Sequence, residues 1–228
     1  MNAAAIIRLI REKGQNVALE KESKEILKAA GIPTTRCHVV CSAEEAGRTA
    51  EKIGYPVVLK LASPSLLHKS EAGGVVLNLG TPEELGAAYE QILARGRELD
   101  PDVKVTIQQM APPGVELIAG ATTDPHFGMV LMLGTGGIFA ELLKDTVFRL
   151  PPLTAADARE MIDSLRGTPL LKGYRGGEAS DLEAVQDVLI RLSDLVCRNP
   201  EIKELDINPL VVYPRGALAL DARMIFTD

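Results

Sequence analysis

Residues 204–223 read ELDINPLVVYPRGALALDAR and carry the strongest structural pattern in the chain. Two apolar runs flank the turn residues YPRG, which is typical of a β-hairpin. Asn208 is expected to end the first strand before Pro209, and Asp221 to lie on the returning strand. Mg²⁺ prefers oxygen ligands and commonly binds one or two carboxylates together with nucleotide phosphates. The hairpin therefore predicts a magnesium site at Asn208 and Asp221; the alternative is a turn-capping Asn208 and a solvated Asp221.

Outward from this hairpin, helical and strand patterns alternate along the whole chain. Helices are expected over residues 1–14, 17–30, 42–53, 82–99, 154–165 and 180–197. Strands are expected over 35–41, 55–62, 75–79, 103–110, 115–122 and 127–134, before the terminal hairpin. Antiparallel pairs late in the chain favour an α+β fold, or a mixed α/β fold, over a purely parallel sheet.

The composition excludes several classes of protein. The 228 residues carry a formal net charge of −6, with 4% aromatic residues and no Trp, which argues against nucleic-acid binding. No apolar stretch reaches the ~18 residues of a membrane span. The three cysteines are too scattered for a disulfide framework, so we expect a cytoplasmic protein. Cys37 and Cys41 flank His38, but no second ligand pair follows, so a β-rich strand is favoured over a metal site.

Two other segments carry residues suited to phosphate. Lys60 is expected at the end of a buried strand, where its ammonium could contact phosphate or simply reach water. The loop SPSLLHKSEAGGV, residues 63–75, joins His68 to the pair Gly73–Gly74. Glycine amides can cradle an anion, and an imidazole can attack phosphorus, although a lone loop histidine is usually solvated.

The glycines of GTGG, residues 134–137, follow a strand and suggest a dinucleotide fingerprint. Phe139 replaces the third glycine of that motif, so a nicotinamide site is disfavoured.

Taken in order, these motifs resemble the ATP-grasp domain of the ADP-forming acyl-CoA synthetases, in particular the separate β subunit of the acetate–CoA ligases. The resemblance runs from about Leu19 to Arg223 and is carried by GIP (31–33), GYPVVLK (54–60), SPSLLHKSEAGGVVLNL (63–79), VELIAGATTDPHFG (115–128), GTGGIFAELLKDTVFRLPPL (134–153), GYRGG (173–177) and ELDINPL (204–210). It implies one ATP-grasp domain over 1–228, with the nucleotide held between an N-terminal lobe (20–107) and a C-terminal lobe (108–228).

The resemblance also implies which residues bind the nucleotide. Lys60 would pair with the α- or β-phosphate, and the Gly73–Gly74 loop would cover the phosphates. Gln109, Met110 and Ala111 would form the hinge beside adenine. Many relatives have Glu at the position of Gln109, so the resemblance leaves the choice between adenine and guanine open. Glu116 would hold the ribose hydroxyls.

The same resemblance assigns catalytic roles. His68 would accept a phosphoryl group from the nucleotide and relay it to a partner subunit. Apart from the resemblance, we expect Asp206, which shares a strand face with Asn208, or another nearby carboxylate to orient the ring of that histidine. Arg149 is a candidate for neutralising a transferring phosphoryl oxygen. Asn208 and Asp221 would hold Mg²⁺.

The implied reaction converts acyl-CoA, ADP and phosphate into acid, CoA and ATP, the chemistry of an acid–thiol ligase. No segment is left over for a CoA-binding domain, so we expect a CoA-binding α subunit with a second phosphohistidine, in an α₂β₂ assembly. Two alternatives stay open: an ATP-grasp-like regulatory module of the kind fused to protein lysine acyltransferases, and a succinyl-CoA synthetase-like β subunit. The acyl group and the physiological direction also stay open.

Overall fold

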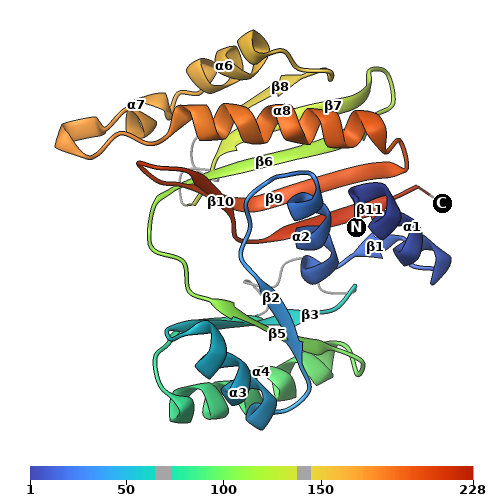
Figure 1. Cartoon of the computed structure of the whole chain (residues 1–228), viewed down its shortest axis with the longest axis vertical. Coiled ribbons are helices and arrows are strands. Elements are labelled where there is room, and N and C mark those ends of the chain that lie inside the picture. Colours follow the sequence, from blue (N-terminus) through green and yellow to red (C-terminus); the bar gives the residue numbers. More distant parts are fainter. Residues whose placement is uncertain (65–72, 138–144, 228) are drawn as a thin grey trace. The chain divides into compact units, whose positions relative to one another are not determined.

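The computed structural model describes residues 1–64, 73–137 and 145–227 (Figure 1). These residues form two compact units, each with its own sheet and its own hydrophobic core. The larger unit comprises Met1–Ala18, Glu22–Thr34 and Pro113–Asp228, and the smaller unit comprises Leu19–Lys21 and Thr35–Pro112. The predicted lobes have different bounds, because residues 22–34 belong to the larger unit and the smaller unit extends to Pro112.

The larger unit is built on an antiparallel sheet in the order β1-β11-β9-β6-β7-β8, with β10 paired to β9. Its strands are β1 (Val17–Ala18), β6 (Val115–Asp124), β7 (Gly128–Thr135), β8 (Thr146–Arg149), β9 (Ile202–Val212), β10 (Ala217–Ala219) and β11 (Ala222–Phe226). The long strand β9 lies at the centre, between β6 and β11. The sheet therefore brings the C-terminal hairpin against the strand that begins at Val115.

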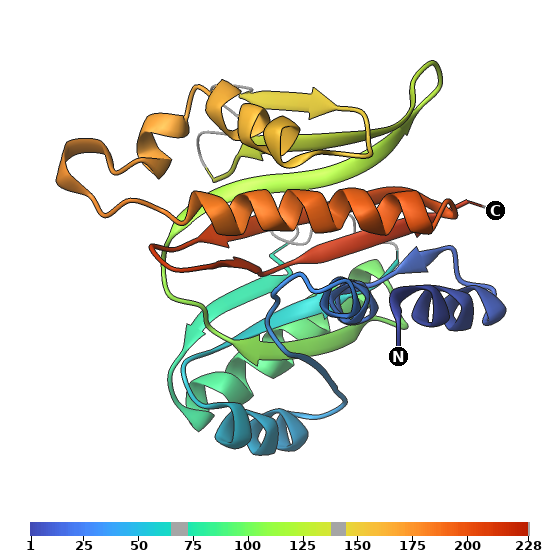
Figure 2. The same ribbon diagram turned by 45° about the horizontal axis from the view of Figure 1, so that its top comes forward.

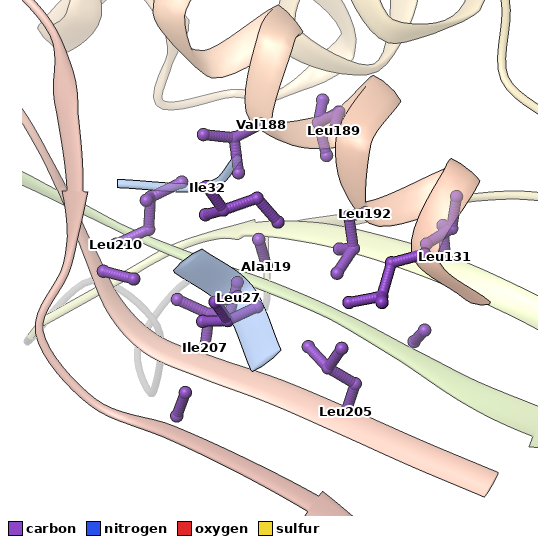
Figure 3. Packing of buried hydrophobic residues seen from close by; sticks show 14 of the residues in the cluster. Leu27, Ile32, Ala119, Leu131, Val188, Leu189, Leu192, Leu205, Ile207 and Leu210 are labelled. Carbon is purple, nitrogen blue, oxygen red and sulfur yellow. The ribbon is translucent and has the colours of Figure 1, made fainter. Parts of the chain in front are cut away.

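Amphipathic helices cover one face of this sheet, and Figure 2 shows α8 lying along it. The helices are α1 (Ala3–Glu12), α2 (Glu20–Ala29), α6 (Ala155–Ser164), α7 (Thr168–Leu171) and α8 (Leu182–Arg198), with a 3₁₀ turn η1 (Tyr174–Gly176) after α7. The first two residues of α2, Glu20 and Lys21, belong to the smaller unit. Leu189 and Leu192 of α8 pack over sheet residues such as Ala119 and Leu205 (Figure 3). This layer is the hydrophobic core of the larger unit.

The smaller unit has a four-stranded antiparallel sheet in the order β2-β5-β3-β4. Its elements are β2 (Cys37–Val40), α3 (Ala43–Ile53), β3 (Val57–Ala62), β4 (Val75–Leu79), α4 (Pro82–Leu99) and β5 (Lys104–Gln109). Ser42 caps α3 by accepting from the Glu45 N–H, and Thr81 caps α4 in the same way from Glu84. The two helices pack on one face of the sheet around Leu59, Leu61 and Ile107.

The structure corrects three local predictions. The segment expected to be one helix over 17–30 begins with the short strand β1, and α2 starts only at Glu20. Strand β9 continues through Pro209 to Val212 instead of ending at Asn208. The returning strand of the hairpin is split into β10 and β11, and Asp221 lies between them.

Within the described ranges, no helix combines the length and the apolar character needed to cross a lipid bilayer.

Candidate functional site

The face of the larger sheet opposite the helices carries a row of polar side chains from β9. Leu205 and Ile207 are buried in the core, and side chains alternate along a strand. Glu204, Asp206 and Asn208 therefore lie on the opposite face.

The structure brings the two predicted metal ligands together. The Asn208 N–H donates to the Asp221 carbonyl oxygen, with 3.2 Å between the atoms. Asp206, two residues before Asn208, lies opposite Arg223 of β11 in the register of the sheet. Asp206, Asn208 and Asp221, all predicted to belong to the site, thus lie at one place in the larger unit.

Electrostatics distinguish Asp206 from an ordinary surface acid. Burial, followed by the neighbouring carboxylates of Glu204 and Asp221, raises the pKa of Asp206 to about 6, and Arg223 acts in the opposite direction. Carboxylates gathered in this way disfavour their own ionised forms, and a bound cation relieves that repulsion.

Across the described part of the chain, no three His, Cys, Asp or Glu residues are grouped as a self-sufficient metal site. An amide oxygen and a carboxylate suit Mg²⁺, which usually keeps waters and completes its shell with substrate phosphates. Asn208 and Asp221 therefore fit a magnesium ion that arrives with a nucleotide better than a resident structural metal.

Glu116 borders a cavity in the larger unit. The cavity has a volume of about 490 Å³ and is lined by Gly114, Val115, Glu116, Leu117, Thr135, Gly136, Gly137, Gly167, Leu170, Leu171, Gly173, Tyr174, Gly177 and Glu178. The Gly136 N–H donates to the Glu116 carbonyl oxygen at 2.8 Å. A Cβ at Gly136 would lie 2.9 Å from the Glu116 carbonyl carbon, so only glycine permits this approach. Thr135, Gly136 and Gly137 of the GTGG motif thus form one wall of this cavity, called here the glycine wall.

Asp145 holds this wall in place and was not singled out from the sequence. Its carboxylate, on a residue only 6% exposed, accepts from the Arg166 N–H at 2.9 Å and the Gly167 N–H at 2.8 Å. Its carbonyl oxygen accepts from the Thr135 N–H at 3.1 Å. One residue therefore ties the end of β7 to the turn before α7, and no local sequence signal reports these long-range bonds.

Lys60 lies in the middle of β3, which corrects the prediction that it ends the strand. Its side chain is 7% exposed, and its ammonium forms an ion pair with the Glu20 carboxylate at 2.8 Å. Glu20 is itself fully buried and was also missed from the sequence. The partners are 40 residues apart, so nothing in either local segment predicts the pair.

The residues predicted to flank the base lie at the C-terminal end of the smaller unit. Gln109 is the last residue of β5 and has an exposed side chain, whereas the side chain of Gln108 is buried and accepts from the Thr35 hydroxyl. The Met110 N–H donates to the Pro56 carbonyl oxygen at 2.9 Å, and Ala111 follows just before the boundary between the units. Of the two predicted loop glycines, Gly73 has a positive φ of 64°.

Gly74, the second of these glycines, accepts through its carbonyl oxygen from the Leu61 N–H at 2.8 Å and so extends the pairing of β3 with β4. His68, the predicted nucleophile, lies outside the described residues.

The structure does not bring Arg149 to the polar face. Arg149 lies opposite Leu131 in the register of the sheet, and Leu131 is buried in the core under the helices. The guanidinium instead forms an ion pair at 2.8 Å with Glu160 of α6, on the helix-covered side. The structure therefore places Arg149 on the helix-covered side, and its role in neutralising a phosphoryl oxygen stays a prediction.

Comparison with known proteins adds independent information. The family model for the ATP-grasp domain matches residues 9–226. The chain is 44% identical over 229 residues to the acetate–CoA ligase [ADP-forming] II subunit beta of Pyrococcus furiosus, and the match covers 98% of this chain and 97% of that protein.

Solved structures agree with the sequence comparison. An acetyl-coenzyme A synthetase 1 of Ca. Korarchaeum cryptofilum, in complex with coenzyme A and Ca-AMPCP, superposes with a TM-score of 0.94 at 41% identity, covering 99% of this chain and 100% of that chain. A second structure of that protein, with coenzyme A and Mg-AMPPCP, has its phosphohistidine segment pointing towards the nucleotide binding site. It superposes with a TM-score of 0.86 at 41% identity, again covering 99% of this chain and 100% of that chain.

Proposed function

This chain belongs to the family of ATP-grasp β subunits of ADP-forming acetate–CoA ligases, and we propose that it binds the nucleotide and transfers the phosphoryl group for such an enzyme. The reaction converts acyl-CoA, ADP and phosphate into acid, CoA and ATP, and it runs in both directions. The observation that best supports this proposal is that Asn208 is hydrogen-bonded to Asp221 close to Asp206, whose pKa is raised. The match to the Pyrococcus furiosus β subunit, over 97% of that protein's length, agrees with it.

The nucleotide is bound by residues of both sequence halves. Lys60 contacts the α- or β-phosphate, and Gly73–Gly74 covers the phosphates through backbone N–H groups. Gln109, Met110 and Ala111 contact the adenine edge. Glu116 accepts from the ribose hydroxyls, which is supported by its exposed carboxylate at the border of a cavity.

Asn208 and Asp221 hold Mg²⁺ through an amide oxygen and a carboxylate. The ion supplies screening of the negative charge on the phosphoryl oxygens when it is bound with the nucleotide. In the ATP-consuming direction, an unprotonated ring nitrogen of His68 attacks the γ-phosphorus. The new N–P bond forms as the bond to the β–γ bridging oxygen breaks, and ADP leaves. Asp206 accepts from the other ring N–H, so that the correct nitrogen is free for the attack.

The relative is named a β subunit, which supports a partner subunit for this chain as well. We propose that this partner is a CoA-binding α subunit with its own phosphohistidine and that two copies of each chain assemble as α₂β₂. A cytoplasmic location remains a prediction from cysteine content.

The direct test measures ATP formed from acetyl-CoA, ADP and phosphate with Mg²⁺. We expect no ATP from this chain alone and steady synthesis once a CoA-binding α subunit is added. ATP synthesis by the rigorously purified chain alone would contradict the proposal that a partner subunit supplies the CoA-binding site. Nucleotide binding without any transfer in the presence of the α subunit would favour the regulatory module over the enzyme.

The relay is tested by isotopic labelling. Incubation of the wild-type chain with γ-labelled ATP and Mg²⁺ should leave an acid-labile, base-stable label on the protein, as expected of a phosphohistidine. His68→Ala should lose this label and all ATP synthesis while still binding ADP. A label that persists in His68→Ala would assign the phosphoryl acceptor to another residue.

A further inference from the structure

The ion pair between Lys60 and Glu20 is buried so deeply that a contribution to protein stability does not explain it. The Glu20 side chain is fully buried, the Lys60 side chain is 7% exposed, and the two charged groups are 2.8 Å apart. Lys and Glu are almost never this buried unless they are paired. Desolvation of two charges offsets most of their attraction, so well-packed apolar residues would serve stability as well or better. The pair therefore calls for a functional reason.

The backbone around Lys60 is rigid. Lys60 lies between β4 and β5, opposite Val75 and Thr106, and the Thr106 hydroxyl donates to its carbonyl oxygen at 3.3 Å. Its neighbours Leu59 and Leu61 are fully buried in the core of the smaller unit. Alternation along the strand directs Lys60 to the face opposite that core. With the main chain fixed, the direction of the ammonium depends on what holds the end of a flexible four-carbon side chain.

We propose that Glu20 is a positioning residue for Lys60: its carboxylate keeps the ammonium charged and pre-directed, so that the nucleotide phosphate meets an oriented donor. This inference rests on the proposed function, in which Lys60 contacts phosphate. An ammonium carries three N–H donors, so the bond to Glu20 is compatible with a second bond to a phosphate oxygen. Without the carboxylate, a lysine side chain must lose rotamer freedom when the nucleotide binds, and that entropy cost lowers affinity.

The test compares ligands with and without phosphates. Calorimetric affinities for ADP and for adenosine, both with Mg²⁺, are measured on the full chain and on Glu20→Gln, which keeps the size and removes the charge. We expect ADP affinity to fall about tenfold, or ~1.4 kcal/mol, while adenosine affinity stays within about twofold of wild type. Glu20→Asp keeps the charge and should recover part of the loss. Glu25→Gln, on the same helix but exposed, is the matched control and should change neither affinity.

A double-mutant cycle shows whether Glu20 acts through Lys60. Lys60→Met should weaken ADP binding at least as much as Glu20→Gln, and the double variant should bind ADP no worse than Lys60→Met alone. The double variant also removes both charges of this pair, so it is the one to measure if Glu20→Gln fails to fold.

Three results would overturn the inference. Wild-type or tighter ADP binding by Glu20→Gln would show that the carboxylate does not assist phosphate binding. Equal losses of ADP and adenosine affinity would indicate a purely structural role. Additive losses in the double variant would show that Glu20 acts independently of Lys60. Failure of the proposed function is distinguishable from these results. If Lys60 does not contact phosphate, Lys60→Met itself would leave ADP affinity unchanged.

Discussion

Replacing Asp145 with alanine should destabilise the larger unit strongly, although this residue contacts neither of the proposed metal ligands. The carboxylate is almost completely buried and accepts two backbone hydrogen bonds, from Arg166 and Gly167. Alanine removes both acceptors at once. The Gly167 N–H is buried and is left without its partner, whereas Arg166 is exposed and water can replace part of what it loses.

The magnitude follows from these two bonds. A hydrogen bond to a charged group contributes about 1.5–3 kcal/mol, and a buried donor left unpaired incurs its full desolvation cost. Taking the upper part of that range for Gly167 and the lower part for Arg166, we expect Asp145→Ala to lose about 4–5 kcal/mol of unfolding free energy. Asp145→Asn keeps one acceptor oxygen but turns an amide N–H₂ toward the second donor, so about 2 kcal/mol should be lost.

The assay is urea unfolding followed by far-ultraviolet circular dichroism. Two compact units need not unfold in one transition, so native-state hydrogen exchange at the amides of β7 reports the larger unit separately. Asp163→Ala is the control, because Asp163 is exposed and its two ion pairs, with Lys172 and Arg159, both lie at the surface. An Asp145→Ala protein within about 1 kcal/mol of wild type, or no more affected than the control, would refute the view that this carboxylate anchors the glycine wall.

Other perturbations give independent checks. Asp221→Ala should raise the Mg²⁺ concentration needed for nucleotide binding while leaving urea stability near wild type, because it removes an anionic ligand from the surface of the sheet; a wild-type Mg²⁺ titration would exclude this residue as a ligand. Asp181 caps α8 and accepts from the Gly216 and Ala184 N–H groups, and these bonds hold its pKa below the ordinary 3.8. A depressed folded-state pKa stabilises the protein above the unfolded value and loses that effect as pH falls through the folded value. Asp181→Asn removes the charge at the start of α8 and should therefore be less stable than wild type by about 1 kcal/mol at pH 7, and the two stabilities should approach each other as the pH falls below 3.8 through the folded-state pKa; a difference independent of pH would contradict this. Gly136→Ala should lower the affinity for ADP, because its Cβ would push into the Glu116 backbone beside the cavity. Unchanged binding would show that this cavity wall does not contact the nucleotide.

Local patterns predicted most of the elements because their signals lie within a few residues. The capping serine at 42 and the proline at 82 marked helices that the structure places at Ala43–Ile53 and Pro82–Leu99. The polar turn before residue 128 correctly indicated the antiparallel pairing of β6 with β7. Family membership was equally accessible, since the motif order extends over nearly the whole chain and the comparisons confirm it.

Local patterns were insufficient where a residue's position depends on distant parts of the chain. Lys60 was expected at a strand end, but β3 extends two residues further, because Leu61 completes the core of the smaller unit. Arg149 follows the glycine motif in sequence, yet the register of β8 with β7 turns it to the helix-covered face. Such a register is set by which face each neighbouring strand buries, and a shift of one residue would reverse it.

The sequence by itself determined the class of the fold and the family. It also determined the proximity of Asn208 and Asp221, because a hairpin brings near neighbours in sequence together through local turn chemistry. Only the tertiary structure decided that Glu20 holds Lys60, that Asp145 anchors the glycine wall, and that Asp206 has a raised pKa. Those features depend on burial and on charges brought close from distant segments. Both effects are created when the core forms and the dielectric around these groups falls.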